Sequence, residues 1–145
     1  MKVLHTGVYM SNPIKMVAEM YPWVPFQKLL GIKIESYDDD YAEISIPFRE
    51  ELAGTPNVYH GGVIASLIDL TGALSAWSGH DDTKGMRAST VSLNVQYLSG
   101  AKGEDIVAKS RAVKRGKELV FCSIEVFSVE SNRLIAKGDI VYRIV

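Results

Sequence analysis

The sequence predicts an α+β fold in which an antiparallel sheet surrounds one long helix. Three observations indicate this. An apolar stretch with helical period, residues 61–77, stands in the middle of the chain. Segments with period-two alternation lie on both sides of it, and the later ones are separated by short breaks that favour antiparallel pairing. The length of 145 residues fits one domain over 1–145, with residues 1–30 as a helical and aromatic lead-in.

Composition narrows the functional class. The chain is 47% hydrophobic and 23% charged, which is typical of a globular protein with its own core. A formal net charge of −1 provides no basic field for nucleic acid or for a membrane surface. Cys122 is the one cysteine, so an intrachain disulfide is excluded and a cysteine-based zinc site is disfavoured. Residues 1–7 lack the apolar core of a signal peptide. We expect a cytoplasmic protein without nucleic-acid or membrane partners.

The lead-in and the first strands follow in order. A short helix is expected over 14–20, after which Pro22 and Pro25 are expected to prevent regular helix. Alternating residues then predict a hairpin of two strands, around 32–36 and 42–46, with an aspartate-rich turn between them. A loop is expected from Arg49 to Tyr59.

The central helix is predicted to run from about Gly61 to Trp77 and to stop at Gly79. Its apolar residues occupy most of the circumference, so we expect it to be enclosed. Strands are then predicted at 89–98, 106–113, 119–129 and 134–144, joined as hairpins. A curved antiparallel sheet around a buried helix is the hotdog arrangement.

Asp69 is the residue most suggestive of chemistry, because it lies in the middle of this apolar helix. A buried carboxylate is costly without a partner, and burial would raise its pKa and make it a better base. The alternative is a structural aspartate that bonds a backbone group or lies on a narrow exposed stripe.

Gly61 and Gly62 open the helix, where unpaired N–H groups and the helix dipole can hold an anionic oxygen. A tight entry into a closely packed helix would explain the same glycines. His60 precedes them and is expected to bind or to cap rather than to act as a base. Nine residues separate His60 from Asp69, about 13 Å along a helix and half a turn out of phase. One shared site therefore requires two copies of the helix, as in a symmetric dimer.

At this point the chain resembles a known family. His60-Gly61-Gly62, a short apolar stretch and Asp69 are similar to the signature of PaaI-type hotdog acyl-CoA thioesterases. The strand from Thr90 to Leu98 is also similar, and the likeness extends from about residue 31 to the C-terminus.

The resemblance implies a role for each matching residue. Asp69 would be the nucleophile or the general base, Gly61 the oxyanion donor, and His60 the residue that shapes the loop. Thr90 would orient the water or the carboxylate, although a plain strand threonine is the simpler interpretation. Many relatives carry an amide side chain six residues before the histidine and a glycine three before it, whereas this chain has Gly54 and Asn57.

Substrate contacts are expected from Asn57 and Gly62, and from Lys114 and Arg115 at a hairpin tip that would meet the CoA phosphates. A solvated tip would explain the basic residues equally well. We expect no separate cofactor, since CoA is part of the substrate, and no metal, since the scattered histidines (His5, His60 and His80) form no zinc motif.

The expected function is hydrolysis of an acyl-CoA thioester by a homodimer, assembled further into a homotetramer. Two alternatives remain open. One is a hotdog enoyl-CoA hydratase or dehydratase, and the other is a non-catalytic module that only binds acyl-CoA.

Overall fold

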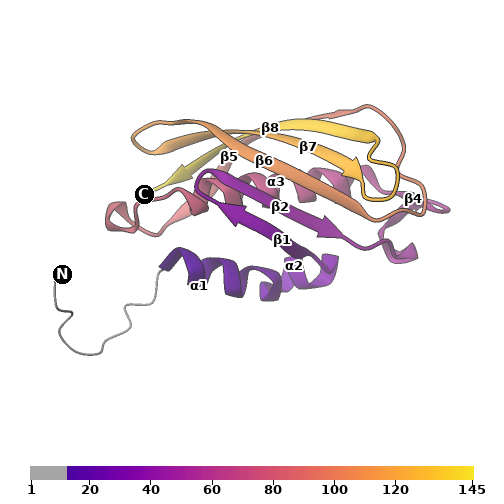
Figure 1. The fold of residues 1–145 in the computed structure, drawn as a ribbon, viewed down its shortest axis with the longest axis horizontal. Coiled ribbons are helices and arrows are strands. Elements are labelled where there is room, and N and C mark those ends of the chain that lie inside the picture. The colour runs from indigo at the N-terminus through magenta and orange to yellow at the C-terminus, as the bar shows by residue number, and fades with distance from the viewer. Residues whose placement is uncertain (1–12) are drawn as a thin grey trace, which may run out of the picture.

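The computed structural model describes residues 13–145. The N-terminal segment 1–7, considered above as a signal peptide, and the histidine within it, His5, lie outside the described residues. Its centre is α3 (Gly61–Ser78), and a six-stranded antiparallel sheet curves over one side of this helix (Figure 1). The N-terminal helices α1 (Pro13–Met20) and α2 (Pro25–Leu30) lie below it in the same view. This arrangement confirms the predicted α+β hotdog architecture.

The sheet has the strand order β1-β2-β6-β7-β8-β5. Its strands are β1 (Lys33–Asp38), β2 (Tyr41–Ile46), β5 (Ala88–Tyr97), β6 (Ile106–Arg115), β7 (Leu119–Ser128) and β8 (Leu134–Ile144). The expectation that β5 and β6 form a hairpin is wrong, because β5 pairs with β8 and lies at the far edge. The connection through residues 98–105 instead crosses towards the start of α3, where Tyr59 N–H donates to the Ala101 carbonyl. β5 is thus left as an edge strand beside α3.

The lead-in is more regular than expected. Pro25 starts α2 instead of preventing a helix, because a proline at the first helical position loses only an N–H that would have no partner there. Gly31 ends α2 in the left-handed conformation with φ of 71°. A 3-10 turn, Tyr21–Trp23, joins the two helices.

The segment expected as a loop before α3 contains short regular elements. They are a 3-10 turn at Glu50–Leu52, β3 (Ala53–Thr55) and β4 (Val58–Tyr59). Another 3-10 turn, Asp82–Lys84, follows α3. Within residues 13–145, no helix is long and apolar enough to cross a lipid bilayer.

The packing of α3 differs along its length. From Thr71 to Ser78 every residue is buried, and inner sheet residues such as Ile124 and Ile140 press against Gly72. The first half of the helix keeps a partly exposed stripe that includes Asp69 and Leu70. The expectation of an enclosed helix therefore holds only for its second half in the single chain, because the sheet and the lead-in segment leave part of that stripe accessible to water.

Candidate active site

The N-terminus of α3 has one open backbone donor. His60 is the N-cap, and its Nδ1 accepts a hydrogen bond of 2.8 Å from the Gly62 N–H. The Val63 N–H donates to the His60 carbonyl at 2.9 Å. Within residues 13–145, the Gly61 N–H has no acceptor. Of the two glycines, Gly61 therefore keeps an amide that is free for the predicted oxyanion role, whereas the Gly62 N–H, predicted to contact substrate, serves the cap.

The cap also orients the histidine ring. Because Nδ1 accepts a hydrogen bond, neutral His60 carries its proton on Nε2, and the exposed ring can offer that N–H to a ligand. Tyr59 anchors the chain just before it: the ring is buried, its hydroxyl donates to the Ile46 carbonyl at 3.0 Å, and it packs edge-on against Phe48. The position of His60 is therefore fixed from both sides.

Close approaches account for two of the glycines. A Cβ on Gly61 would lie 3.3 Å from the ring of Tyr97, whose hydroxyl donates to the Gly61 carbonyl at 2.7 Å. A Cβ on Gly54 would lie 3.2 Å from the Cα and the ring of His60. Gly54, where relatives carry an amide, thus lies directly against the capping histidine.

Asp69 is held from β5. The Thr90 hydroxyl donates to Asp69 Oδ1 at 2.7 Å, leaving Oδ2 for another partner. The carboxylate is half-buried, so it is neither enclosed as expected nor fully solvated. Of the two roles that the resemblance implied for Thr90, contact with the water or with the carboxylate, this hydrogen bond fits the second, and its effect on catalysis stays a prediction.

Two residues near the site were not singled out in the sequence. Tyr97 holds the Gly61 carbonyl, as described, and the Tyr21 hydroxyl donates to the carbonyl of Leu70, the neighbour of Asp69, at 2.7 Å. Burial raises the pKa of Tyr21 well above its usual value, and the nearby Tyr142 and Asp69 raise it further. The alternation of apolar and polar residues in the sequence does not distinguish these tyrosines from other apolar residues that pack in the core.

The single chain does not complete a site. Gly61 and Asp69 are eight residues apart in one straight helix, which separates them by about 12 Å along its axis. A donor must lie about 3 Å from the oxygen that it stabilises, and a base must lie equally close to its proton. The two groups of one chain therefore cannot act on one carbonyl together.

The remaining predicted contacts lie elsewhere. Asn57 is exposed in the turn between β3 and β4 with φ of 61°, a conformation that suits glycine or asparagine, so its backbone fits the position where relatives have glycine. Arg115 donates to Asp40 Oδ1 at 2.6 Å and to the Ala76 carbonyl at 2.8 Å, and Lys114 precedes it in β6. Both basic residues thus lie at the C-terminal end of α3.

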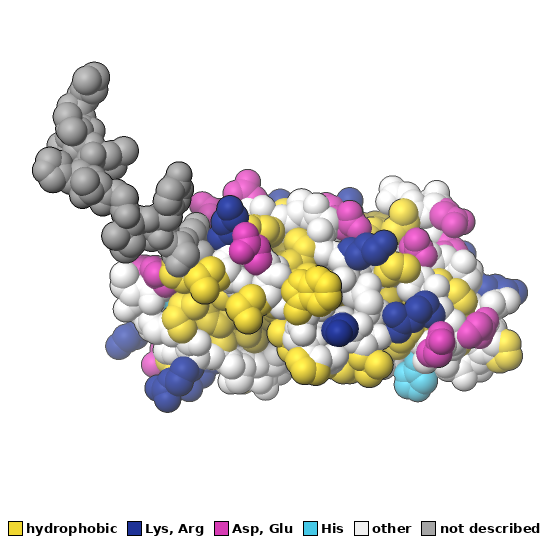
Figure 2. All heavy atoms as spheres, turned by 90° about the horizontal axis from the view of Figure 1, so that it is seen from below, with side chains coloured by type: hydrophobic (Ala, Val, Ile, Leu, Met, Phe, Trp, Pro, Cys, Tyr) yellow, Lys and Arg dark blue, Asp and Glu magenta, His cyan; other side chains and the backbone are white. Residues whose placement is uncertain are grey.

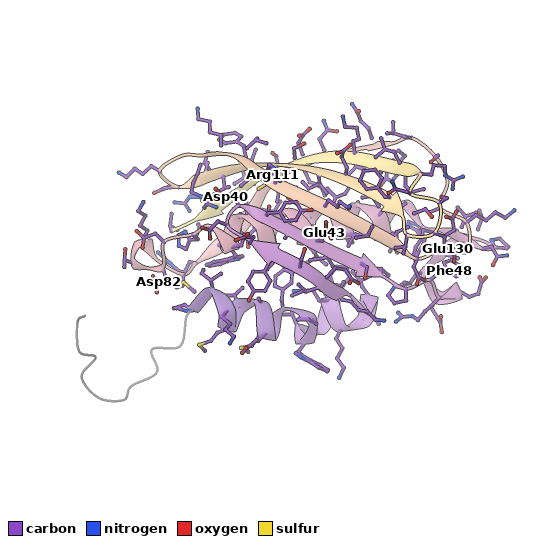
Figure 3. All side chains as sticks on the ribbon, in the orientation of Figure 1. Asp40, Glu43, Phe48, Asp82, Arg111 and Glu130 are labelled. Atoms are coloured by element: carbon purple, nitrogen blue, oxygen red, sulfur yellow. The ribbon has the colours of Figure 1, made fainter. Side chains whose placement is uncertain are left out.

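Figure 3 shows the two ends of the molecule, with Asp40 and Asp82 near one end and Phe48 near the other. A cavity of about 500 Å³ lies at the Asp40 end, and acidic side chains outnumber basic ones in its lining, which includes Asp38, Asp39, Asp40 and Asp82 with Lys15 and His80. It lies far from Gly61 along α3, and its negative charge does not suit the phosphates of CoA.

The chain is similar to known proteins over most of its length. The model of the thioesterase superfamily matches residues 56–135. The medium/long-chain acyl-CoA thioesterase YigI of Escherichia coli is 27% identical over 148 residues, covering 92% of this chain and 95% of the relative. Human acyl-coenzyme A thioesterase 13 is 30% identical over 115 residues, covering 78% and 80% of the two chains.

Solved structures show the same fold. The Escherichia coli PaaI protein of the phenylacetic acid degradation operon matches with a TM-score of 0.80 and 22% identity, covering 94% of this chain and 96% of the other. Thioesterase superfamily member 2 of Mus musculus matches with a TM-score of 0.77 and 24% identity, covering 92% and 98%. With a matched family model over more than half of its length and this fold, the chain belongs to the thioesterase superfamily.

Proposed function

We propose that this protein hydrolyses acyl-CoA thioesters to a free acid and CoA, at a site shared between two subunits. The observation that carries the proposal is the pairing of a half-buried carboxylate, Asp69, with the Thr90 hydroxyl on a helix whose first amide, Gly61 N–H, is open. The names of its relatives as acyl-CoA thioesterases support the substrate class.

The geometry of β5 supports a shared site. Thr90 near the start of β5 contacts Asp69, and Tyr97 at its end contacts Gly61, so β5 runs antiparallel to α3. The free edge of β5 can pair with a second copy of itself. A twofold axis near the middle of the strand would place Asp69 of one subunit opposite Gly61 of the partner subunit.

This edge also has the character of a protein interface. Apolar side chains on and beside β5 are strongly exposed in the single chain, among them Val91 at 56% and Tyr97 at 54%. The partly exposed stripe of α3 that carries Asp69 adjoins β5 through the Thr90 hydroxyl. Pairing would cover both surfaces and bury Asp69 further, which would increase its basicity.

The proposed reaction needs no separate cofactor, since CoA is part of the substrate. The partner's Gly61 N–H donates to the thioester carbonyl oxygen and stabilises the negative charge that develops there. Asp69 takes a proton from water as the water oxygen attacks the carbonyl carbon, and the C–S bond then breaks. The CoA thiolate leaves and recovers a proton, giving free thiol and carboxylic acid.

A second route uses the same residues. Asp69 Oδ2 attacks the carbonyl carbon directly, CoA leaves as the thiolate, and water hydrolyses the resulting mixed anhydride. In either route Thr90 holds Oδ1, so that Oδ2 faces the substrate.

CoA recognition is proposed for residues around the mouth of this site. His60 offers its Nε2–H, and Asn57 offers an exposed amide in the hairpin before it. Lys114 and Arg115 are proposed phosphate contacts from a neighbouring subunit, and Arg115 also binds Asp40. Two dimers would form the proposed tetramer, for which the outer sheet face offers exposed Val113 and Phe121.

The test is a panel of acyl-CoAs assayed for free thiol with the parent and Asp69→Asn proteins. We expect parental thiol release and a fall in kcat of at least about a thousandfold in the variant, with an unchanged melting temperature. Thiol release by Asp69→Asn at the parental rate would refute the assignment. Hydration of an enoyl-CoA without thiol release would favour the hydratase alternative, and binding without any turnover would favour the binding module.

A further inference from the structure

A buried tyrosine, Tyr142, lies beside the proposed catalytic carboxylate. It is near the end of β8, where it is the partner of Thr90 in the neighbouring strand β5. Side chains of residues paired in this way lie on the same face of a sheet, with Cβ atoms about 5 Å apart. Because the Thr90 hydroxyl contacts Asp69 on α3, the register of the sheet places Tyr142 next to the Thr90–Asp69 pair.

The hydroxyl of Tyr142 makes one hydrogen bond, in which it is the acceptor. Trp77 Nε1–H donates to Tyr142 Oη at 3.1 Å, and both side chains are buried. This bond occupies a lone pair of the oxygen and leaves the proton of the hydroxyl free. Within residues 13–145, no side chain or carbonyl group accepts that proton. Buried donors in proteins nearly always have an acceptor, so the Tyr142 proton is available for a bound molecule.

Electrostatics connect Tyr142 with Asp69. Burial raises the pKa of Tyr142, the hydrogen bond from Trp77 lowers it, and the nearby Asp69 carboxylate raises it again. The hydroxyl therefore keeps its proton at neutral pH. In the described part of the chain Tyr142 and Asp69 do not bond to each other directly. A water molecule between them would bond to both, because water accepts as well as donates.

The lead-in segment packs against the same part of α3. Figure 2 shows the face on which the lead-in helices lie, and apolar side chains gather there. Tyr21, in the turn between α1 and α2, is buried, and its hydroxyl donates to the Leu70 carbonyl beside Asp69. After burial, the nearby Tyr142 and Asp69 also raise the pKa of Tyr21, so the three groups lie close together. The proton of Tyr21 is bound by the backbone, whereas that of Tyr142 is available beside the carboxylate.

We propose that the Tyr142 hydroxyl and Asp69 Oδ2 together hold the water that attacks the thioester. The inference rests on the proposed thioesterase function and selects the first of its two routes. Tyr142 donates its proton to the water oxygen, and the water donates one of its own protons to Oδ2. Thr90 holds Oδ1, so that the second carboxylate oxygen faces the water.

The reaction then follows from these two contacts. The water oxygen bonds to the carbonyl carbon as its proton passes to Asp69 Oδ2, and the C–S bond breaks with CoA leaving as the thiolate. The thiolate takes up the proton that Asp69 releases, which restores the carboxylate. Tyr142 keeps its proton throughout, so it orients the water and does not act as an acid or a base.

A double-mutant cycle tests the assignment, with kcat measured as thiol release under saturating acyl-CoA. Tyr142→Phe removes the hydroxyl but keeps the ring, and it should lower kcat about tenfold while KM stays close to the parental value. Trp77→Phe removes the donor that orients the hydroxyl and should lower kcat severalfold. In the Tyr142→Phe background, Trp77→Phe should cause no further loss, because Trp77 acts through the hydroxyl. Losses that multiply in the double variant would show two separate packing effects and would overturn the inference.

The matched control is Tyr41→Phe. Tyr41 also lies in the sheet, and its hydroxyl also makes a hydrogen bond, to Glu43. Its neighbour Ala42 is fully buried towards α3, so alternation places Tyr41 on the outer face. We expect parental kcat in Tyr41→Phe, measured below the melting temperature of each variant. A parental kcat in Tyr142→Phe, or an equal loss in the two tyrosine variants, would overturn the role of Tyr142.

An isotope measurement on the parent protein needs no variant and separates the inference from the proposed function. Turnover in water enriched in the heavy oxygen isotope should put the label in the released acid and none in the Asp69 carboxylate. Mass spectrometry of the peptide that contains Asp69 detects any label there. Label in Asp69 would show that water attacks a mixed anhydride at the Asp69 carbon, and would overturn the inference while the proposed function stands. Absence of thiol release from every acyl-CoA would instead refute the proposed function, and the inference with it.

Discussion

The open amide of Gly61 can be removed almost without other change. Proline at this position deletes the N–H and fits the first helical residue, where its fixed φ is suitable. His60 has φ of −59° and ψ of 135°, which is the conformation favoured before proline. Gly61→Ala is the matched control, because it adds a comparable Cβ 3.3 Å from the Tyr97 ring but keeps the donor.

The expected magnitude follows from the role of the donor. Loss of one oxyanion-hole hydrogen bond lowers kcat by about a hundred- to a thousandfold, or about 3–4 kcal/mol. We expect this loss in Gly61→Pro and a change of only a few fold in Gly61→Ala, with KM and melting temperature similar in the two proteins. Thiol release under saturating acyl-CoA measures kcat, and thermal unfolding checks the fold. Equal kcat values in the two variants would refute the oxyanion role of Gly61.

Three further outcomes are expected. Thr90→Val removes the hydroxyl that donates to Asp69 and should lower kcat about tenfold or more. Thr90→Ser keeps a hydroxyl and should keep most of the parental kcat. Similar kcat values in the two variants would contradict a role for this hydrogen bond. Burial raises the pKa of the Cys122 thiol, so a thiol reagent should modify this cysteine slowly in the folded protein. After unfolding, one equivalent of reagent should react per chain. Rapid modification of the folded protein would contradict the burial of Cys122. The pKa of Tyr21 is raised in the folded chain, so the unfolded chain loses that proton first, and the free energy of unfolding should fall as pH rises above about 10. Chemical denaturation at pH 8 and pH 11 should show a smaller fall for Tyr21→Phe, and an identical fall would contradict the assignment.

Much of the fold could be predicted because its elements carry strong periodic patterns. The boundaries of α3 and β8 agree with the prediction to within one residue, since helical period and alternation continue to their ends. Local signals did not predict how β5 pairs. The break after it resembles a hairpin, but the order of strands in the sheet depends on contacts between distant segments.

The candidate site was predicted in part, for a related reason. Asp69, Gly61 and His60 stand out by residue type, and the structure gives Gly61 its open amide and His60 its cap. Thr90 and Tyr97 are seven residues apart, so strict alternation would place them on opposite faces of β5. A bulge between Thr90 and Ser92 turns both towards α3, and alternation cannot reveal such a bulge.

The half-burial of Asp69 had no signal in the sequence either. A helix that is apolar on most sides is expected to be buried, but the pattern does not show whether its own chain or a second subunit buries it. The partly exposed stripe of α3 is consistent with the proposed dimer, in which the partner would provide the missing cover.

Subunit mixing tests the central claim most directly, namely that Asp69 works with Gly61 of the partner subunit. Asp69→Asn and Gly61→Pro chains, each nearly inactive alone, are unfolded, mixed in equal amounts and refolded. Half of the dimers should then be mixed, and each mixed dimer should contain one intact site, so turnover should recover to about a quarter of the parental value. Recovery no greater than the sum of the two separate variants, with mixed dimers present, would contradict a shared site.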